Sequence, residues 1–326
     1  MQETHVAGTL AGLLQTYLDQ ENIHAPQISL QLANYSADVK IPTPVWWGLL
    51  EEIQKIKNQA ALGLKIGSLG RPHHFGVMGY LIMHCQTLGE ALLRFQRYQE
   101  LIHDFSRVRV TIDKSSLIMK WDTELGKSTQ LSDEVFLSCF ISFIQHISSE
   151  DVKPKSLQFN HENSFSVSEY EAIIKCPVSF GHDQVALEMS LDDVNVAINS
   201  SDPDLLAIMD SKAQALKRED EFLMSLQELL SKSLSQGIPT LEKTAKQLKI
   251  SARTLHRRLQ ERDLNFKKFL QQTREQLAKY YLSDANLSLN EISYLLGYSE
   301  QSSFARAFKI WFEMTPNEYR KISPGQ

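Results

Sequence analysis

Hydrophobic positions in the first 200 residues follow two periods, and together they predict a domain that mixes helices and strands. Apolar residues at helical spacing predict helices over residues 6–21, 43–59, 87–102, 131–147 and 166–176. Alternating apolar and polar residues predict strands over residues 107–113, 116–122, 156–161 and 184–190. Thr43, ahead of Pro44, and Ser166 are the expected N-caps of two of these helices. The stretch 67–80 is rich in glycine and proline, which predicts a loop or turn.

A single long helix is predicted over residues 203–236, ending near Gly237-Ile238-Pro239. Its apolar positions nearly fit a seven-residue repeat, which Asp220 and Gln227 interrupt. The interruption favours docking of this helix on its own protein over a free coiled coil, while a dimer contact through it stays open.

The last part of the chain uses one helical design twice. Residues 240–260 predict a helix, a turn at Lys249-Ile250-Ser251 and a second helix with Ser251 as its N-cap. Residues 288–312 repeat the arrangement, with a capping box at the start and Gly297 as the left-handed end of the first helix. The capping box consists of Ser288 and Glu291, and the buried side of the second helix is marked by Phe304, Phe308 and Trp311.

These patterns predict an α+β N-terminal domain followed by an all-α C-terminal domain with two helix-turn-helix units. We place the N-terminal domain at residues 1–200, a helical linker at 201–238 and the C-terminal domain at 239–326. An amphipathic helix over residues 266–283 can join the two helical units. We expect the chain from about Lys232 onward to fold alone.

Composition is that of an ordinary globular protein, with 42% hydrophobic and 22% charged residues among 326. No apolar run reaches membrane-spanning length, and the N-terminus lacks the basic region of a signal peptide. Three scattered cysteines, Cys85, Cys139 and Cys176, fit a reducing cytoplasm and offer no zinc-ligand spacing. We therefore expect a cytoplasmic protein without a metal site or cofactor.

Charge is distributed unevenly along the chain. Residues 232–326 hold 16 lysines and arginines against 9 aspartates and glutamates, whereas residues 1–231 hold 18 against 30. A basic domain on an acidic protein is a candidate for nucleic-acid binding. Acidic lipids or an acidic partner protein are the alternatives that charge alone leaves open.

The stretch SARTLHRRLQ, residues 251–260, shows what the basic charges could face. Leu255 and Leu259 share one side of the predicted helix, while Arg253, His256 and Arg257 share another. For an isolated helix, a solvated basic face would explain this pattern. Two such units in tandem on a basic segment favour helix-turn-helix recognition of a DNA major groove instead.

The segment LLGYSEQSSFARAFKIWFEMTPNEYR, residues 295–320, resembles the C-terminal part of the AraC/XylS family of bacterial transcription regulators. The resemblance rests on Gly297-Tyr298, Phe304, Arg306, Phe308-Lys309, Thr315-Pro316 and Tyr319-Arg320. Upstream, SARTLHRRL and TREQLAKYYL resemble the first recognition helix and the connecting helix of that family, so the resemblance covers residues 240–321. RDLNFKKFL departs from the family's usual glycine and Ser-Pro, and we expect only a local change in that turn.

The resemblance implies two recognition helices that enter successive major grooves on one face of DNA. The first would present Arg253, Thr254, His256 and Arg257, and the second Gln301, Ser302, Ser303 and Arg306. Arginine suits guanine and glutamine suits adenine in the major groove. We assign phosphate contacts to Arg258, Lys267 and Lys309. For each of these residues the alternative is an exposed side chain that meets only water.

The stretch HHFGVMGYLIMHCQTLGEALLRFQRY, residues 73–98, resembles the effector domain of regulators that include the ornithine-utilisation type. That domain is named arabinose-binding by analogy, and the likeness covers roughly residues 20–200. It implies a sensor for a small ligand that can also dimerise. An anion-friendly pocket could use Arg71, His73, His74, His84, Arg94, Arg97 and Tyr98, although solvated or half-buried roles explain each of them as well. Side chains expected in the core instead are Trp46, Trp47, Phe75 and Met78.

The leading hypothesis is a homodimeric transcription regulator of promoter DNA, controlled by an unidentified small effector and working with RNA polymerase. One rival is a constitutive DNA-binding protein whose N-terminal domain only dimerises. The other is an enzyme tethered to DNA, against which the sequence has no phosphate-binding glycine motif, no nucleophile elbow and no HExxH.

Overall fold

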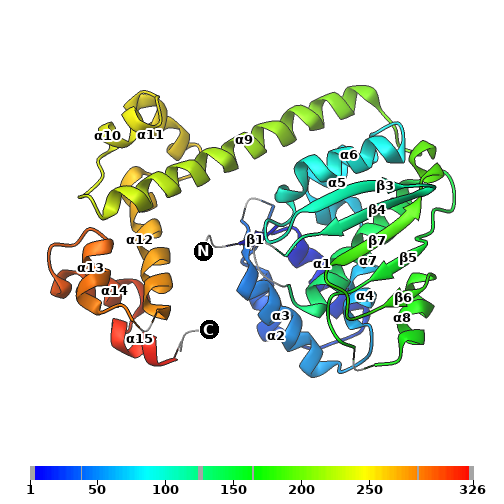
Figure 1. Cartoon of the computed structure of the whole chain (residues 1–326), viewed down its shortest axis with the longest axis horizontal. Coiled ribbons are helices and arrows are strands. Elements are labelled where there is room, and N and C mark those ends of the chain that lie inside the picture. Colours follow the sequence, from blue (N-terminus) through cyan, green and yellow to red (C-terminus); the bar gives the residue numbers. More distant parts are fainter. Residues whose placement is uncertain (1–3, 38, 124–127, 164, 285, 323–326) are drawn as a thin grey trace. The chain divides into compact units, whose positions relative to one another are not determined.

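The computed structural model describes residues 4–37, 39–123, 128–163, 165–284 and 286–322 (Figure 1). The chain forms two compact units, residues 2–217 and 218–326. Both units share one long helix, α9 (Pro203–Leu234), whose first half belongs to the first unit and whose second half belongs to the second.

The first unit combines a five-stranded sheet with eight further α-helices among the described residues. Its helices are α1 (Leu10–Gln20), α2 (Pro26–Leu32), α3 (Thr43–Ile56), α4 (Leu62–Gly67), α5 (Val77–Met83), α6 (Leu88–Tyr98), α7 (Gln130–Ile147) and α8 (Val167–Ile174). The sheet contains β3 (Val108–Asp113), β4 (Ser116–Trp121), β7 (Val185–Ser190), β5 (Ser156–Gln158) and β6 (Val178–Ser179), in that order. A separate pair consists of β1 (His5–Val6) and β2 (Ile41–Pro42).

The sheet has one apolar and one polar face. The register aligns Val110 with Met119 and Met119 with Leu187, so apolar side chains of three neighbouring strands share one face. On the other face, the Glu188 carboxylate accepts hydrogen bonds from the Ser116 and Ser156 hydroxyls, at 2.6 and 3.0 Å. All pairings are antiparallel except β5 with β6. A half-solvated antiparallel sheet explains the alternation that made its strands predictable from sequence.

Helix α7 is central to the core, and α4 packs closely against it. Glycines at two positions one turn apart on α4 permit this approach, because a Cβ at Gly63 or Gly67 would overlap the Leu131 or Val135 carbonyl of α7. Most apolar residues of α7 are buried, including Phe140, Phe143 and Ile144. The predicted core residues Trp46, Phe75 and Met78 are indeed buried, and Trp47 is half-buried.

Several boundaries in the first unit differ from those that the sequence predicts. Residues 5–6 pair with β2, so the first helix begins at Leu10 instead of residue 6. The expected loop 67–80 contains a 3₁₀ turn at Pro72–Phe75 and the start of α5, because Gly76 with φ +56° redirects the chain between them. The helix expected from Thr43 as N-cap includes Thr43, with Pro42 preceding it. Ser166 lies at the N-cap of α8, but its hydroxyl meets the Ser168 hydroxyl instead of a backbone N–H.

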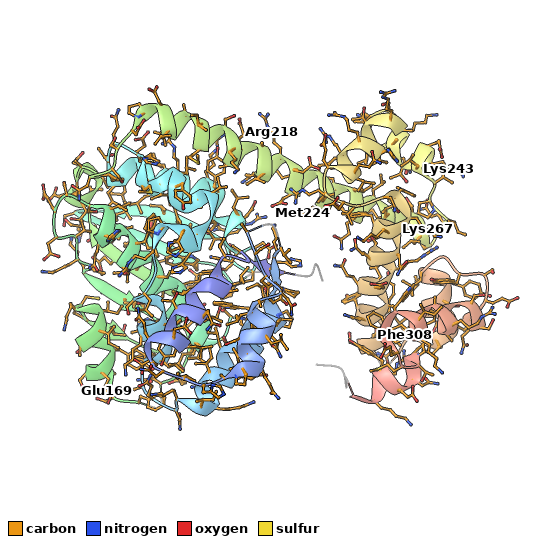
Figure 2. All side chains as sticks on the ribbon, turned by 180° about the vertical axis from the view of Figure 1, so that it is seen from behind. Glu169, Arg218, Met224, Lys243, Lys267 and Phe308 are labelled. Atoms are coloured by element: carbon orange, nitrogen blue, oxygen red, sulfur yellow. The ribbon has the colours of Figure 1, made fainter. Side chains whose placement is uncertain are left out.

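The second unit contains two hydrophobic cores. Its helices are α10 (Leu241–Gln247), α11 (Ala252–Gln260), α12 (Phe266–Ser283), α13 (Leu289–Leu295), α14 (Gln301–Phe312) and α15 (Pro316–Ile322). The first core joins α9, α10, α11 and the start of α12. The second joins the end of α12 with α13, α14 and α15, and its centre is Phe308, which Figure 2 labels. Helix α12 therefore contributes to both cores and connects the two helical units.

Candidate DNA-binding interface

The two helix-turn-helix units have the same turn geometry. Lys249 and Gly297 occupy equivalent positions after α10 and α13, with φ of +57° and +76°. In each turn the next residue's N–H reaches back five positions, from Ile250 to the Ala245 carbonyl at 3.0 Å and from Tyr298 to Ser293 at 2.9 Å. Glycine was recognisable from sequence as a residue that favours this conformation, whereas Lys249 adopts it without that signal.

The predicted caps are confirmed. The Ser251 hydroxyl accepts the Thr254 N–H at 3.0 Å at the start of α11. At the start of α13, Ser288 and Glu291 form the reciprocal capping box, with the Ser288 N–H donating to the Glu291 carboxylate at 2.8 Å. Hydrogen bonds from the hydroxyl and amide of Ser288 hold the pKa of Glu291 below its ordinary value. The starts of α11 and α13 therefore have the caps that the sequence predicts.

The first recognition helix, α11, separates its apolar and basic sides as predicted. Leu255 and Leu259 are fully buried, and Arg253, His256 and Arg257 are exposed. Thr254 is half-buried, and its hydroxyl lies 2.8 Å from that of Ser251 at the cap. The Arg257 guanidinium pairs with Glu261 at 3.1 Å in an exposed contact. Such surface pairs contribute about 0–1 kcal/mol, so Arg257 can leave Glu261 for another partner at little cost.

Arg258, to which we assign a phosphate contact, is half-buried at the back of α11. Its guanidinium lies 4.4 Å from the ring centroid of Phe222 on α9. Next to it, Arg262 approaches Asp220 of the same helix at 3.6 Å. Both contacts connect α11 and the turn that follows it to α9. The phosphate contact of Arg258 stays a prediction.

The second recognition helix, α14, presents Gln301, Ser302, Arg306 and Lys309 to solvent. Phe304 and Phe308 face its core, and Ser303 is half-buried. The Ser302 hydroxyl donates to the Glu300 carboxylate at 3.1 Å. Lys267, at the start of α12, is exposed as well, and Figure 2 labels it. Exposed residues of both recognition helices are therefore available to a ligand.

Two arginines attach the second helix-turn-helix unit, formed by α13 and α14, to the connecting helix α12. Arg274 of α12 donates from Nε to the Leu296 carbonyl at 3.0 Å, and its guanidinium lies 4.8 Å from the Tyr298 ring centroid. Arg320 of α15 donates to the Leu287 carbonyl at 2.8 Å. The Leu296 carbonyl lies at the end of α13, and Arg320 also donates from Nε to the Leu282 carbonyl near the end of α12, at 3.3 Å. Both arginines thus satisfy carbonyls at helix ends and connect α13 and α15 to α12.

The turn RDLNFKKFL contains a left-handed residue and a capped helix start. Asp263 takes the left-handed conformation with φ +52°, which is the conformation that a glycine would favour. Asn265 then caps α12 by accepting the Lys268 N–H at 2.9 Å. These features support the expectation that the departure from the family pattern is local, which stays a prediction.

The residues expected near an effector lie in several separate arrangements of the first unit. His74 Nδ1 accepts the Arg71 N–H at 3.1 Å, and the exposed His73 lies beside His74. His84 Nδ1 lies 2.8 Å from the Ser200 carbonyl oxygen.

On α6, Arg94 pairs with Glu90 at 2.8 Å and approaches Asp210 of α9 at 4.0 Å. The exposed Arg97 lies over the ring of the buried Tyr98. None of the seven expected residues lines either of the two cavities described below. Their role in binding an effector stays a prediction.

Sequence reasoning missed an aromatic cavity of about 30 Å³ between α6, α7 and the sheet. The His103 ring lies against Phe105 and Phe136, with centroids 4.5 and 4.7 Å away. Burial lowers the pKa of His103 to about 4, and within the described chain its Nδ1 has no hydrogen-bond partner. Asp133 also lines this cavity and lies 3.1 Å from His161. The cavity has room for about two water molecules.

A second cavity lies beside the same helix, lined in part by the neighbouring Glu134. Two adjacent carboxylates in the otherwise apolar helix 131–147 are the signal in the sequence that could have identified both cavities. In the part of the chain that the structure describes, no group of three or more histidine, cysteine, aspartate or glutamate side chains could hold a metal ion. Within the same residues, no helix has the length and apolar character needed to cross a membrane.

Comparison with known proteins agrees with this architecture. A family model described as the arabinose-binding N-terminal domain of AraC transcription regulators matches residues 28–197, and a helix-turn-helix domain model matches residues 244–322. The ornithine utilization regulator of Pseudomonas aeruginosa is 23% identical over 273 residues, covering 82% of this chain and 80% of its own. The transcriptional regulator VirS of Mycobacterium tuberculosis is 29% identical over 179 residues, covering 54% of this chain and 53% of its own.

Among solved structures, the transcriptional regulator CdpR of Pseudomonas aeruginosa matches with a TM-score of 0.48 and 23% identity. The match covers 95% of this chain and 96% of that one.

A mixed α/β domain followed by two helix-turn-helix units on one scaffold defines a DNA-binding transcription regulator. The chain belongs to the AraC family of transcription regulators, in the group with the arabinose-binding type of N-terminal domain. The family and the relatives are transcription regulators and not enzymes, so the hypothesis of a DNA-tethered enzyme is set aside.

Proposed function

We propose that the protein binds a specific promoter sequence as a homodimer and that a small effector in the first unit controls this binding. The observation that carries the proposal is the pair of recognition helices fixed to one connecting helix, each with exposed side chains that can read base edges. Two such helices on one scaffold suit successive major grooves, whose centres are about 34 Å apart along one face of DNA.

Direct base reading is the proposed role of Arg253, His256, Arg257, Gln301, Ser302 and Arg306. Arginine offers two parallel donors that match the O6 and N7 atoms of guanine, and glutamine matches adenine in the same way. Lys267 and Lys309, together with the half-buried Arg258, are assigned to phosphates, where a positive charge suffices. The half-buried Thr254 and Ser303 stay in the proposal as residues at the helix starts that a groove edge can contact.

Effector control and dimerisation are assigned to the first unit. Supporting this, the unit has its own core and its own cavities, and the family model for it is named for ligand binding. RNA polymerase is the partner that a promoter-bound regulator would affect, and the cytoplasm is the compartment that such a regulator shares with DNA. A constitutive regulator without an effector is the second candidate, and ligand binding separates the two.

Replacing Arg257 or Arg306 with alanine should cost about 1–3 kcal/mol of binding free energy on the cognate sequence and relax preference at one base pair. Lys309→Ala should weaken binding to all sequences alike and flatten the slope of log affinity against log salt by about one. The cognate duplex is obtained by selection from a random pool, and affinities are measured on cognate and scrambled duplexes at several salt concentrations.

Unchanged melting temperatures would show that these exposed substitutions leave the fold intact. Glu261→Gln is the matched control, because it releases Arg257 from its ion pair without removing the base-reading group. Equal losses on cognate and scrambled DNA for both arginine variants would refute base reading by them, and recognition would then depend on DNA shape.

The full-length protein should sediment as a dimer, and residues 218–326 alone as a monomer. The reason is that dimerisation is assigned to the first unit, which the shorter fragment lacks. Sedimentation equilibrium over a range of concentrations, with and without DNA, measures this. A monomeric full-length protein under every condition would remove the dimer from the proposal.

A further inference from the structure

A cavity of about 150 Å³, with several polar side chains in its lining, lies between α3, the start of α4, the start of α7 and α8. Its floor is formed by Glu134 and Tyr170, which are both about 1% exposed. Glu51, Gln54, Gln130 and Phe165 contribute to its walls and mouth. Cavities of this size hold about six nonhydrogen atoms, as a benzene-binding cavity of equal volume shows, so the space suits a small organic molecule.

The floor carries a buried carboxylate without a buried cation beside it. Glu134 accepts the Gly63 N–H at 3.0 Å, the Gln130 amide at 2.8 Å and a hydrogen bond from the Tyr170 hydroxyl. These are neutral donors, and within the described residues no ion pair is found for Glu134, while the nearby His161 pairs with Asp133. Burial raises the pKa of Glu134, which means that its charged form lacks full compensation in the unliganded protein. A cation that enters the cavity would supply that compensation.

The walls favour the same kind of ligand. Phe165, 39% exposed, and the buried Tyr170 both line the cavity, and aromatic rings attract cations through their quadrupoles. A second carboxylate, Glu51, is exposed beside the opening. At the rim, the Lys65 ammonium donates a hydrogen bond to the Gln59 side chain at 3.0 Å. Lys65 therefore does not neutralise the Glu134 carboxylate on the floor.

The other ligand classes fit less well. Two carboxylates repel anions, and the amide and hydroxyl groups of the lining would lose hydrogen bonds to an apolar guest. A bare metal ion is disfavoured because no group of three or more ligating side chains occurs among the described residues. The aromatic cavity at His103, about 30 Å³, is the alternative place for a neutral ring compound.

We infer that the first unit binds a small organic cation, a primary ammonium or guanidinium compound, in this cavity, with Glu134 as its counter-charge. The inference rests on the proposed effector control and names the site and the chemical class of the effector. Glu51 would attract the cation at the mouth, and Gln54 and Gln130 would accept hydrogen bonds from its N–H groups.

The test is isothermal titration and thermal shift of the full-length protein with putrescine and agmatine. Butanediol and succinate serve as uncharged and anionic counterparts of putrescine, and phenol probes the aromatic cavity. Either cation should raise the melting temperature by mass action, whereas butanediol and succinate should not. Glu134→Gln should weaken cation binding by about tenfold or more, and Glu51→Gln by up to about fivefold.

The matched control is Glu169→Gln, which makes the same charge change on the exposed face of α8 (Figure 2). It should leave cation affinity unchanged, and so it separates a specific site from general attraction to an acidic domain. Glutamine resembles the protonated form that burial favours at Glu134, so the fold should tolerate it; if Glu134→Gln does not fold, the exposed Glu51→Gln still gives a result.

The inference falls if neither cation binds, if Glu169→Gln weakens binding as much as Glu134→Gln, or if only phenol shifts the melting temperature. Gel shifts of the same preparations on the selected duplex keep the two proposals apart. DNA binding without cation binding overturns this inference alone. Cation binding that Glu134→Gln abolishes, in a protein that binds no DNA, supports the site and overturns the proposed function.

Discussion

A fragment that begins at Arg218 should fold cooperatively and bind DNA, whereas one that begins at Lys232 should lose most of its stability. The reason is that Leu226 and Leu230 of α9 are fully buried in the first core of the second unit, together with Leu255 and Leu259 of α11. Truncating one such leucine costs about 2–5 kcal/mol, and a small domain is stable by only about 5–15 kcal/mol. Removing both leucines takes away the apolar side of α9 against which Leu255 and Leu259 of α11 pack.

The measurement is urea unfolding of the two fragments followed by circular dichroism. In the longer fragment, Leu226→Ala should lower the unfolding free energy by about 2–5 kcal/mol. Ile238→Ala, at a position 64% exposed, is the apolar control and should change it by less than about 0.5 kcal/mol. Equally cooperative transitions of both fragments would show that α9 adds nothing to the second unit.

The sequence predicts that the chain from about Lys232 onward folds alone, whereas the buried leucines of α9 lead us to expect that it needs the second half of this helix. Periodicity predicts the long helix and favours its docking on the protein, and the break at Gly237-Ile238-Pro239 predicts where the next domain begins. A helix pattern shows that a face is apolar but not which core it enters. The buried leucines place the second half of α9 in the first core, so the compact units divide within the helix, at Lys217 and Arg218.

The same limit applies to individual site residues. Local signals were sufficient for Ser251, Ser288 and Gly297, because caps and left-handed turns depend on residues a few positions apart. Arg258 could not be placed in this way, since its partner Phe222 lies 36 positions earlier in the chain.

Cavity linings depend even more on tertiary contacts. The aromatic cavity joins Phe95 of α6, Phe140 of α7 and Val185 of β7, which only the sheet register and helix packing bring together. The repeated helical units were therefore predictable in detail, whereas the first unit was predictable in its elements but not in its cavities.

The first unit should lose stability as the pH falls from about 6.5 to about 4, because two histidines are buried in their neutral form. His103 is 4% exposed and His74 is 2% exposed, and burial is the main cause that lowers the pKa of each to about 4. His74 also accepts a hydrogen bond at Nδ1, which protonation would remove. At His103, Asp104 acts in the opposite direction but does not offset the burial.

Between these pH values the two histidines bind more protons in the unfolded chain than in the folded one, so their contribution to the unfolding free energy decreases as the pH is lowered. A difference of one unit between the pKa values of the folded and unfolded states corresponds to about 1.36 kcal/mol. Each histidine should therefore lower the unfolding free energy by about 3 kcal/mol at pH 4. The full stabilisation is present above about pH 6.5, where both histidines are neutral in either state.

Urea unfolding of the full-length protein at several pH values, read from the transition of the first unit, measures the effect. His103→Phe replaces the neutral buried imidazole by an apolar ring. Because one of the two titrating histidines is then removed, the unfolding free energy should depend less steeply on pH, by the contribution of one proton. His146→Phe makes the same change at an exposed position and should leave the slope as in the wild type. An unaltered slope in His103→Phe would mean that His103 is not the buried neutral group, and acid lability would then come from carboxylates such as Glu188, whose hydrogen bonds lower its pKa.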